Sequence, residues 1–243
     1  MRSCIFSSSY LRSVSWNSEE LLCKAVLNPL VLSKWQKSSM KDVILHDMHS
    51  EKDSESFSKA IHELNIGLSE DFLALERLWL KDELNHYTGF RYLLGLICGE
   101  PSKEVEEQAC LPAFGALMPL LQDEFHLCLL LAYDEIVTTT LYISEYSSYD
   151  EAADPFISRW IRYVARDEAY HFGNLLKIML THYSHRFHEM PTLVEQLIKH
   201  ELSIQNYGKT FVLDRAGYHL SRSFLLQCVQ PLLIFARKHS PNR

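Results

Sequence analysis

The chain has 243 residues, of which 47% are hydrophobic and 23% are charged, and its formal net charge is −7. This balance is typical of a globular protein, excludes disorder over most of the chain, and offers no basic surface to a nucleic acid. Glycine and proline number only 8 each, and because folds with many turns need more of both, the composition predicts long helices.

Helical periodicity extends along nearly the whole chain. The first half of the sequence predicts an amphipathic stretch, interrupted near Asn28, and then two long helices. Ser69 would cap the second of these helices, and Gly-Glu-Pro would end it. The second half predicts a crossover and two more long helices, the last of them opened by Asp154 and Pro155. The expected ranges are 18–37, 41–65, 70–98, 102–117 for a short helix and crossover, 119–147, 155–185, 191–207 and 209–238.

One all-α domain over residues 1–243 is the simplest account of this pattern, because no segment alternates in the manner of a strand and no linker is evident. Four long helices predict a four-helix bundle at about 41–185. Residues 99–117 would then form a long crossover between the second and third bundle helices. Additional helices are expected at the N-terminus and, after the bundle, at 191–238.

Two of the long helices contain a Glu-x-x-His motif, formed by Glu83 with His86 and by Glu168 with His171. Residues at i and i+3 share one face of a helix, so each pair can bind the same metal ion. Both faces are otherwise apolar, which points these ionisable groups into the core. One such motif is common by chance, but two on core-facing stripes indicate a metal site, because a divalent cation neutralises several buried carboxylates at once.

The distances from the expected loops add two further carboxylates. Glu135 and Glu168 each lie 13 residues from the loop between their helices, so an antiparallel pair places both at the same level. The same count places Glu51 of the first bundle helix level with Glu83. Glu55, about one turn nearer the loop, is the alternative.

A glutamate from each of two helices and a Glu-x-x-His motif from each of the other two is the ligand arrangement of di-iron carboxylate bundles. Oxygen and imidazole ligands suit iron or manganese better than zinc or calcium. The expected cofactors are therefore two iron ions, or a manganese–iron pair. The predicted ligands are Glu51, Glu83, His86, Glu135, Glu168 and His171.

These segments resemble the ferritin-like di-iron superfamily and, within it, the soluble acyl-carrier-protein desaturases, over about residues 40–185. The resemblance lies in DMHSE at 47–51, WLKDELNH around the first motif and ARDEAYH around the second. It implies a ferritin-like fold and an O2-dependent oxidoreductase, either a desaturase or an oxygenase. The implied substrate is apolar, such as an acyl chain tethered to a carrier, and electrons would come from an external donor.

Two further side chains are candidate catalytic groups. Thr138 matches the position of a threonine near the oxygen-binding face in the desaturases, although it or Thr139 can instead bond back to the preceding helical turn. Asp167 precedes Glu168 and is expected either to hydrogen-bond a ligand histidine on a neighbouring helix or to lie at the surface. Arginines at 159, 162 and 166 form either a docking face for an acidic carrier or an ordinary solvated face.

Other functions remain open at this point. The di-iron N-oxygenases of small molecules have a comparable size, but the region of their extra histidine holds Ile161 and Val164 here. Non-catalytic iron binding, as in a ferritin, and a purely structural helical protein are the remaining alternatives. The sequence leaves a homodimer open.

The six cysteines are scattered and none forms a CxxC pair, which favours reduced thiols and a cytoplasmic protein over a disulfide scaffold or a zinc ribbon. Residues 1–16 are rich in serine and arginine and lack acids, so import into an organelle is the alternative. The longest apolar run, 127–133, is much shorter than the ~20 residues that cross a membrane, so we expect no membrane span.

Overall fold

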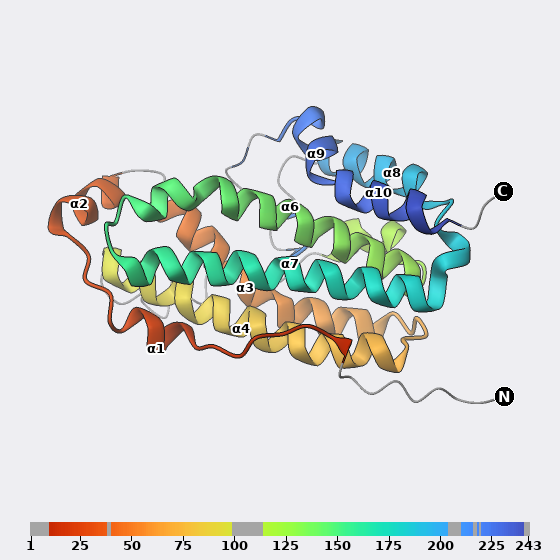
Figure 1. Ribbon diagram of the computed structural model, residues 1–243, viewed down its shortest axis with the longest axis horizontal. Coiled ribbons are helices and arrows are strands. Elements are labelled where there is room, and N and C mark those ends of the chain that lie inside the picture. Colours follow the sequence, from red (N-terminus) through yellow and green to blue (C-terminus); the bar gives the residue numbers. More distant parts are fainter. Residues whose placement is uncertain are drawn as a thin grey trace.

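The computed structural model describes residues 10–37, 40–98, 114–203, 210–215, 218 and 220–240, and within these ranges it is all-α without strands. Four long helices run side by side along the longest axis of the molecule (Figure 1). The helix α3 packs mainly on α4, α6 packs mainly on α7, and α4 also contacts α7. The bounds are α3 (Met40–Glu63), α4 (Glu70–Cys98), α6 (Glu124–Asp150) and α7 (Pro155–Tyr183).

Side-chain caps explain where these helices begin. Asp154 accepts hydrogen bonds from the backbone N–H groups of the first turn of α7, and Pro155 occupies its first position. Ser69 accepts one from Phe72 at the start of α4. The expected start of α6 at residue 119 is wrong, because Asp123 is the N-cap. The preceding residues form a short 3-10 helix, η2 (Phe114–Leu120), and the crossover residues 99–113 lie outside the described ranges.

Of the described helices, only α6 is long and apolar enough to cross a membrane by length and composition. In its most apolar window, 72% of the residues are buried inside the structure. Its apolar side chains from Phe125 to Leu131 pack against the neighbouring helices as part of a continuous core. This burial is what the central helix of a bundle shows.

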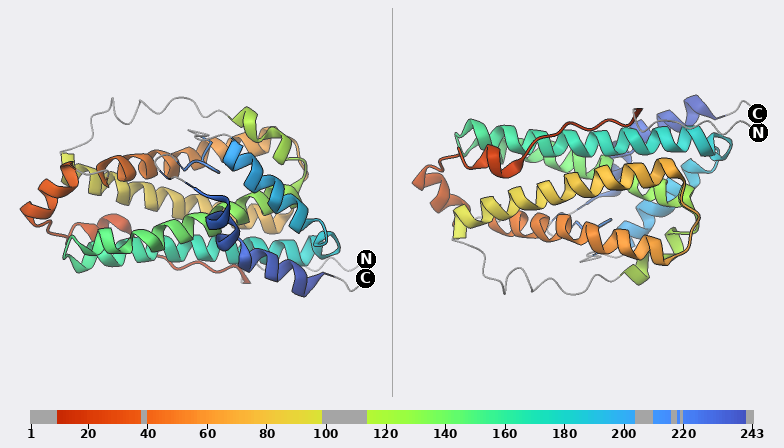
Figure 2. Two further views of the ribbon diagram at one scale, coloured as in Figure 1. Left: turned by 90° about the horizontal axis from the view of Figure 1, so that it is seen from above. Right: turned by 90° about the horizontal axis from the view of Figure 1, so that it is seen from below.

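A chain segment at each end covers the four long helices (Figure 2). At the N-terminus, Arg12 exchanges backbone hydrogen bonds of 2.9 and 2.8 Å with the Asn174 side chain of α7. The stretch expected at 18–37 forms two helices, α1 (Ser18–Leu22) and α2 (Pro29–Lys37). The turn η3 (Ser184–Arg186) and the helix α8 (Met190–Ser203) follow α7, and α8 packs against α6.

The single helix expected at 209–238 is wrong. Residues 210–215 are not helical, and two shorter helices follow, α9 (Arg222–Cys228) and α10 (Gln230–His239). Phe211 and Leu213 have positive φ angles of 64° and 58°, which a helix does not allow. Their backbone is held in this conformation because Asp134 of α6 accepts hydrogen bonds from Leu213 N and from Arg215. The expected interruption at Gly208 lies outside the described residues.

The interior consists of two apolar clusters separated by a polar layer. One cluster contains Phe57 and Trp79 with most of the apolar side chains of α6, and the other contains Phe90 and Trp160. On α4 the residues between Trp79 and Phe90 include Glu83 and His86, which are 2% and 0% exposed. A buried charged layer between two dry cores needs internal partners, since water does not solvate it.

Candidate metal centre

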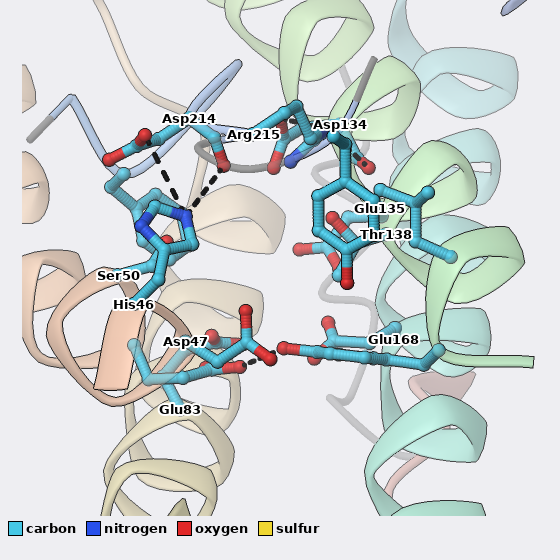
Figure 3. A pocket seen from close by; sticks show the side chains of 15 residues that line it. His46, Asp47, Ser50, Glu83, Asp134, Glu135, Thr138, Glu168, Asp214 and Arg215 are labelled. Atoms are coloured by element: carbon cyan, nitrogen blue, oxygen red, sulfur yellow. Dashed lines mark hydrogen bonds and ion pairs between the residues drawn. The ribbon is translucent and has the colours of Figure 1, made fainter. Parts of the chain in front are cut away.

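Each of the four long helices contributes to this buried polar layer. Glu51 comes from α3, Glu83 and His86 from α4, Glu135 from α6, and Glu168 and His171 from α7, and each is at most 4% exposed. Figure 3 shows Glu83, Glu135 and Glu168 projecting from three different helices toward one space. The structure thus brings together all six residues that the sequence analysis selected.

The six side chains form two overlapping groups that could each hold a metal ion. In each group, one ligand atom from every residue lies within 4.8 Å of the others. Glu83 and Glu168 belong to both groups, so either group could draw on their carboxylates. The groups are Glu51, Glu83, His86 and Glu168, and Glu83, Glu135, Glu168 and His171.

Both imidazoles direct Nδ1 into the cluster. His86 Nδ1 lies 3.2 Å from Glu168 Oε1 and 3.5 Å from Glu51 Oε2. His171 Nδ1 lies 3.3 Å from Glu83 Oε1 and 3.5 Å from Glu135 Oε2. One nitrogen of each ring therefore faces carboxylate oxygens on helices other than its own.

The opposite nitrogen of each ring faces an aspartate. His86 Nε2 lies 3.5 Å from Asp167 Oδ2, and His171 Nε2 lies 3.3 Å from Asp82 Oδ2. Each aspartate precedes the glutamate of one motif and contacts the histidine of the other. Asp167 is thus buried beside the ligand histidine of the neighbouring helix, as one of the two expectations had it, at ion-pair distance and without a hydrogen bond, whereas Asp82 is hydrogen-bonded to its histidine. The sequence analysis missed Asp82, although both motifs read Asp-Glu-x-x-His.

Three aromatic side chains were also missed as partners of the cluster. Tyr142 OH donates to Glu51 Oε1 at 2.8 Å, and Trp79 Nε1 donates to Glu135 Oε1 at 3.0 Å. Trp16 Nε1 donates to Asp167. Tyr142 and Trp79 lie on apolar helix faces and Trp16 lies before α1, so none of these hydrogen bonds could be anticipated from helical spacing.

The structure distinguishes the two carboxylates of α3 and the two threonines of α6 that the sequence left as alternatives. Glu55 is exposed, whereas Glu51 is 4% exposed and lies in the cluster. Thr139 Oγ1 donates to the Glu135 carbonyl at 2.7 Å, which is the back-bonding expected of a helical threonine. Thr138 instead lines a cavity beside Glu135 and Glu168 (Figure 3).

Burial and mutual charge shift the pKa values of the side chains in this cluster. Burial raises the pKa of Glu83 and Glu135, and the nearby Glu168 carboxylate raises both further. Burial alone would lower the pKa of His86 and His171, but the surrounding carboxylates raise it well above its usual range. These four groups are therefore stabilised in their protonated forms. Burial alone would raise the pKa of Glu168, but hydrogen bonds from Glu135 and the histidines lower it. Metal binding would release protons from the four.

Several ligand atoms of the cluster have no hydrogen-bond partner even though they are buried. They are Glu51 Oε2, Glu83 Oε1, both ring nitrogens of His86 and Glu168 Oε1. Unpaired buried polar atoms are costly, and each requires an explanation. Converging carboxylate oxygens and imidazole nitrogens of this kind could bind metal, and the residues present fit a di-iron site.

A polar cavity of about 40 Å³ adjoins the cluster between α3 and α6. Residues of the 210–218 segment line it, including Asp214 and Arg215, and Thr138 and Glu135 lie on the opposite wall (Figure 3). Arg215 contacts Asp134 at 2.6 Å and lies 3.5 Å from Glu201 Oε1. A C-terminal segment that the sequence analysis read as helix thus forms part of this wall.

A second, apolar cavity of about 10 Å³ reaches the other side of the cluster. Leu75, Leu131 and Leu175 line it together with Glu135 and His171. These leucines are at most 4% exposed and belong to the continuous apolar core. This space is close to the ~10–15 Å³ that a cavity needs to hold one water molecule.

The arginines expected to form one face of α7 are partly paired with acids of this chain. Arg166 lies 3.0 Å from Asp167, and Arg162 lies 2.8 Å from Asp150. Arg159 is exposed. Two of the three guanidinium groups are thus already engaged by acids of this chain.

Comparison of the chain with protein-family models, with curated proteins and with solved structures finds no match. The described residues nevertheless form an all-α structure with a buried cluster of glutamate and histidine side chains, and such a cluster fits a di-iron site.

Proposed function

We propose that the protein is a non-haem di-iron, O2-dependent oxidoreductase built on a ferritin-like four-helix bundle. The observation that carries the proposal is the pair of overlapping ligand groups that share Glu83 and Glu168. Glu51 and His86 would complete the site of one ion, and Glu135 and His171 the site of the other. When bound, the iron pair supplies the electrons that reduce O2, and a manganese–iron pair would suit the same ligands.

The residues around the ligands support a working site. Asp82 and Asp167 hold the Nε2 sides of the imidazoles and so fix the direction of Nδ1. Tyr142 fixes one oxygen of Glu51 by its hydrogen bond. Thr138, a partly exposed residue of the cavity wall, would move a proton into the cavity.

A reactive centre is favoured over a structural metal site. Iron and manganese favour more donors than the four residues of each group, whereas a structural site is usually closed by its protein ligands. The polar cavity reaches Glu135 and Glu168 directly, so a small molecule has access to the same space. Both features are what a site that binds O2 and a substrate requires.

The substrate expected from the sequence is an apolar acyl chain, such as one tethered to a carrier protein. An external donor would supply the electrons. The support for this substrate is the apolar wall formed by Leu131 and Leu175 beside Glu135. The second candidate is N-oxygenation or hydroxylation of a small molecule. The specific observation that favours it is the polar lining of the larger cavity, including Ser50 and Thr138.

The proposal is tested by adding iron(II) without oxygen to the metal-free protein and then following O2 consumption. We expect about one O2 to be consumed for each iron pair, and we expect His171→Ala to lose this reaction. Glu55→Gln, an exposed change on α3, is the matched control and should behave as the wild type. Two bound irons without O2 consumption would refute the oxidase function. Continued iron uptake far beyond two ions would instead support storage.

A further inference from the structure

The polar cavity carries more acidic than basic side chains, even when the four carboxylates that would bind metal are set aside. Asp47, Asp134 and Asp214 line it, and Arg215 is the one arginine or lysine among the described lining residues. Arg215 is held by Asp134 at 2.6 Å and also faces Glu201 of α8. Its charge is therefore already matched by these two acids.

Among the acids that line the cavity, Asp47 is the most important for what the cavity can bind. It is 6% exposed, and its Oδ2 atom is buried without a hydrogen-bond partner. Figure 3 shows its carboxylate projecting from α3 into the cavity in front of α6. Burial raises the pKa of Asp47, and the neighbouring Glu145 and Glu51 carboxylates raise it further. A buried, unpaired carboxylate is costly unless a cation or a hydrogen-bond donor meets it.

The other charged groups near Asp47 do not supply that donor. Glu145 accepts a hydrogen bond from Tyr218, and its second oxygen is also buried without a partner. His46 lies 3.8 Å from Asp214 Oδ1, so its charge, when it is protonated, is directed to Asp214. The acids around Asp47 thus strengthen the negative potential of the cavity.

The size of the cavity admits a small donor to Asp47. Its volume of about 40 Å³ is well above the ~10–15 Å³ that a cavity needs to hold one water molecule. An ammonium group is close to water in size and donates three hydrogen bonds, so it fits this space. A metal ion is a poor fit, since the two ligand groups found among the described residues do not include Asp47.

We infer that this cavity binds the protonated primary amine of the substrate, with Asp47 as its main counter-charge. The inference rests on the second candidate of the proposed function, oxidation of a small molecule, and names that molecule as a small primary amine. Ser50 and Thr138, which line the cavity and are partly exposed, mark the side from which the amine enters. An amine held at Asp47 lies in the space onto which Glu135 and Glu168 face.

The test uses the full chain loaded with manganese(II), which does not react with O2 on the time scale of the assay, and n-butylamine as the probe. Isothermal titration calorimetry compares n-butylamine with the uncharged 1-butanol. We expect the amine to bind at least about tenfold more tightly than the alcohol. Asp47→Asn should remove that preference, whereas Glu55→Gln, an exposed acid on the same helix, should retain it.

Asp47→Asn should fold, because it removes an uncompensated buried charge while keeping the shape of the side chain. Thermal unfolding checks this point. A second variant, Ser50→Lys, places an ammonium group on a tether at the cavity, and we expect it to prevent n-butylamine binding in a folded protein.

The outcomes separate this inference from the proposed function. Two bound metal ions without any amine preference would overturn the inference and leave the proposed function standing. An amine preference that depends on Asp47 in a protein that binds no metal would support the amine site and refute the oxidoreductase. Unchanged amine affinity in Asp47→Asn, or a third metal ion that this variant loses, would also overturn the inference.

Discussion

Gly89 of α4 sets the distance between the two helices that carry the histidine motifs. A Cβ atom at this position would lie 2.6 Å from Trp160 Cζ2 of α7, whereas ordinary contacts begin at 3.4 Å. Trp160 has little freedom to move, because it is 0% exposed and its Nε1 donates to Ser18 Oγ at 3.0 Å. Gly89→Ala therefore requires either a shift of Trp160 or a wider gap between α4 and α7, three residues after His86.

The expected effect follows from opposing contributions. Alanine in a helix is more favourable than glycine by about 1 kcal/mol. Overpacking costs about 1–3 kcal/mol, and the loss of the Trp160 hydrogen bond costs about 1 kcal/mol more. We expect the free energy of unfolding to fall by roughly 1–3 kcal/mol. Gly173→Ala is the matched control: Gly173 lies two residues after His171 on α7, and a Cβ there meets no atom within 4 Å.

Urea unfolding followed by circular dichroism compares the two variants. With a slope of about 3 kcal/mol per molar urea, a loss of about 2 kcal/mol lowers the midpoint by roughly 0.7 M. Gly173→Ala should instead raise the free energy of unfolding by up to ~1 kcal/mol. If Gly89→Ala proves as stable as Gly173→Ala, the close packing of Trp160 on α4 is not what sets the spacing of these helices.

Three other changes test the site and its surroundings. Asp82→Asn and Asp167→Asn should each weaken metal binding about 10–100-fold, because each leaves one imidazole without its orienting carboxylate. A competitive chelator titration measures this effect, and equal affinity in both variants and the wild type would exclude the orienting role. Asp134→Ala should lower the free energy of unfolding by about 3–5 kcal/mol, measured by urea unfolding, since Arg215 then loses its closest buried partner. An unchanged free energy of unfolding would show that the segment at 210–215 contributes little to the fold. For the metal-free protein, the pKa values of Glu83, Glu135, His86 and His171 are raised on folding, so their stabilisation is present at low pH and is lost as pH rises through the folded-state values. The pKa of Glu168 is lowered, so its stabilisation is lost only on acidification. The melting temperature of the metal-free protein should therefore fall as pH rises across the neutral range and recover when metal is added, and a rise without metal would contradict these shifts.

The sequence predicts helix positions well where a cap is present. The helix α4 has the expected bounds, because Ser69 and the Gly-Glu-Pro sequence define both ends. The start of α7 follows from Asp154 and Pro155 in the same way. Where a distant side chain holds the backbone, as Asp134 holds Leu213, local periodicity gives the wrong result.

The same contrast holds for the candidate site. Counting residues from the loops selects Glu51 over Glu55, because antiparallel helices of known rise convert sequence distance into height. The reciprocal pairing of Asp82 with His171 depends on how α4 and α7 are rotated about their axes, which sequence distance does not determine. The cavity and Asp47 depend on the fold of the C-terminal segment and are therefore visible only in three dimensions.

Metal content per chain tests the central claim most directly. Metal-free protein titrated with iron(II) without oxygen should bind two ions. Glu83→Gln and Glu168→Gln should each impair both sites, whereas Glu51→Gln and Glu135→Gln should each impair one, since only the first two residues belong to both groups. Wild-type protein that binds no iron, or four variants that bind as much as the wild type, would contradict the account.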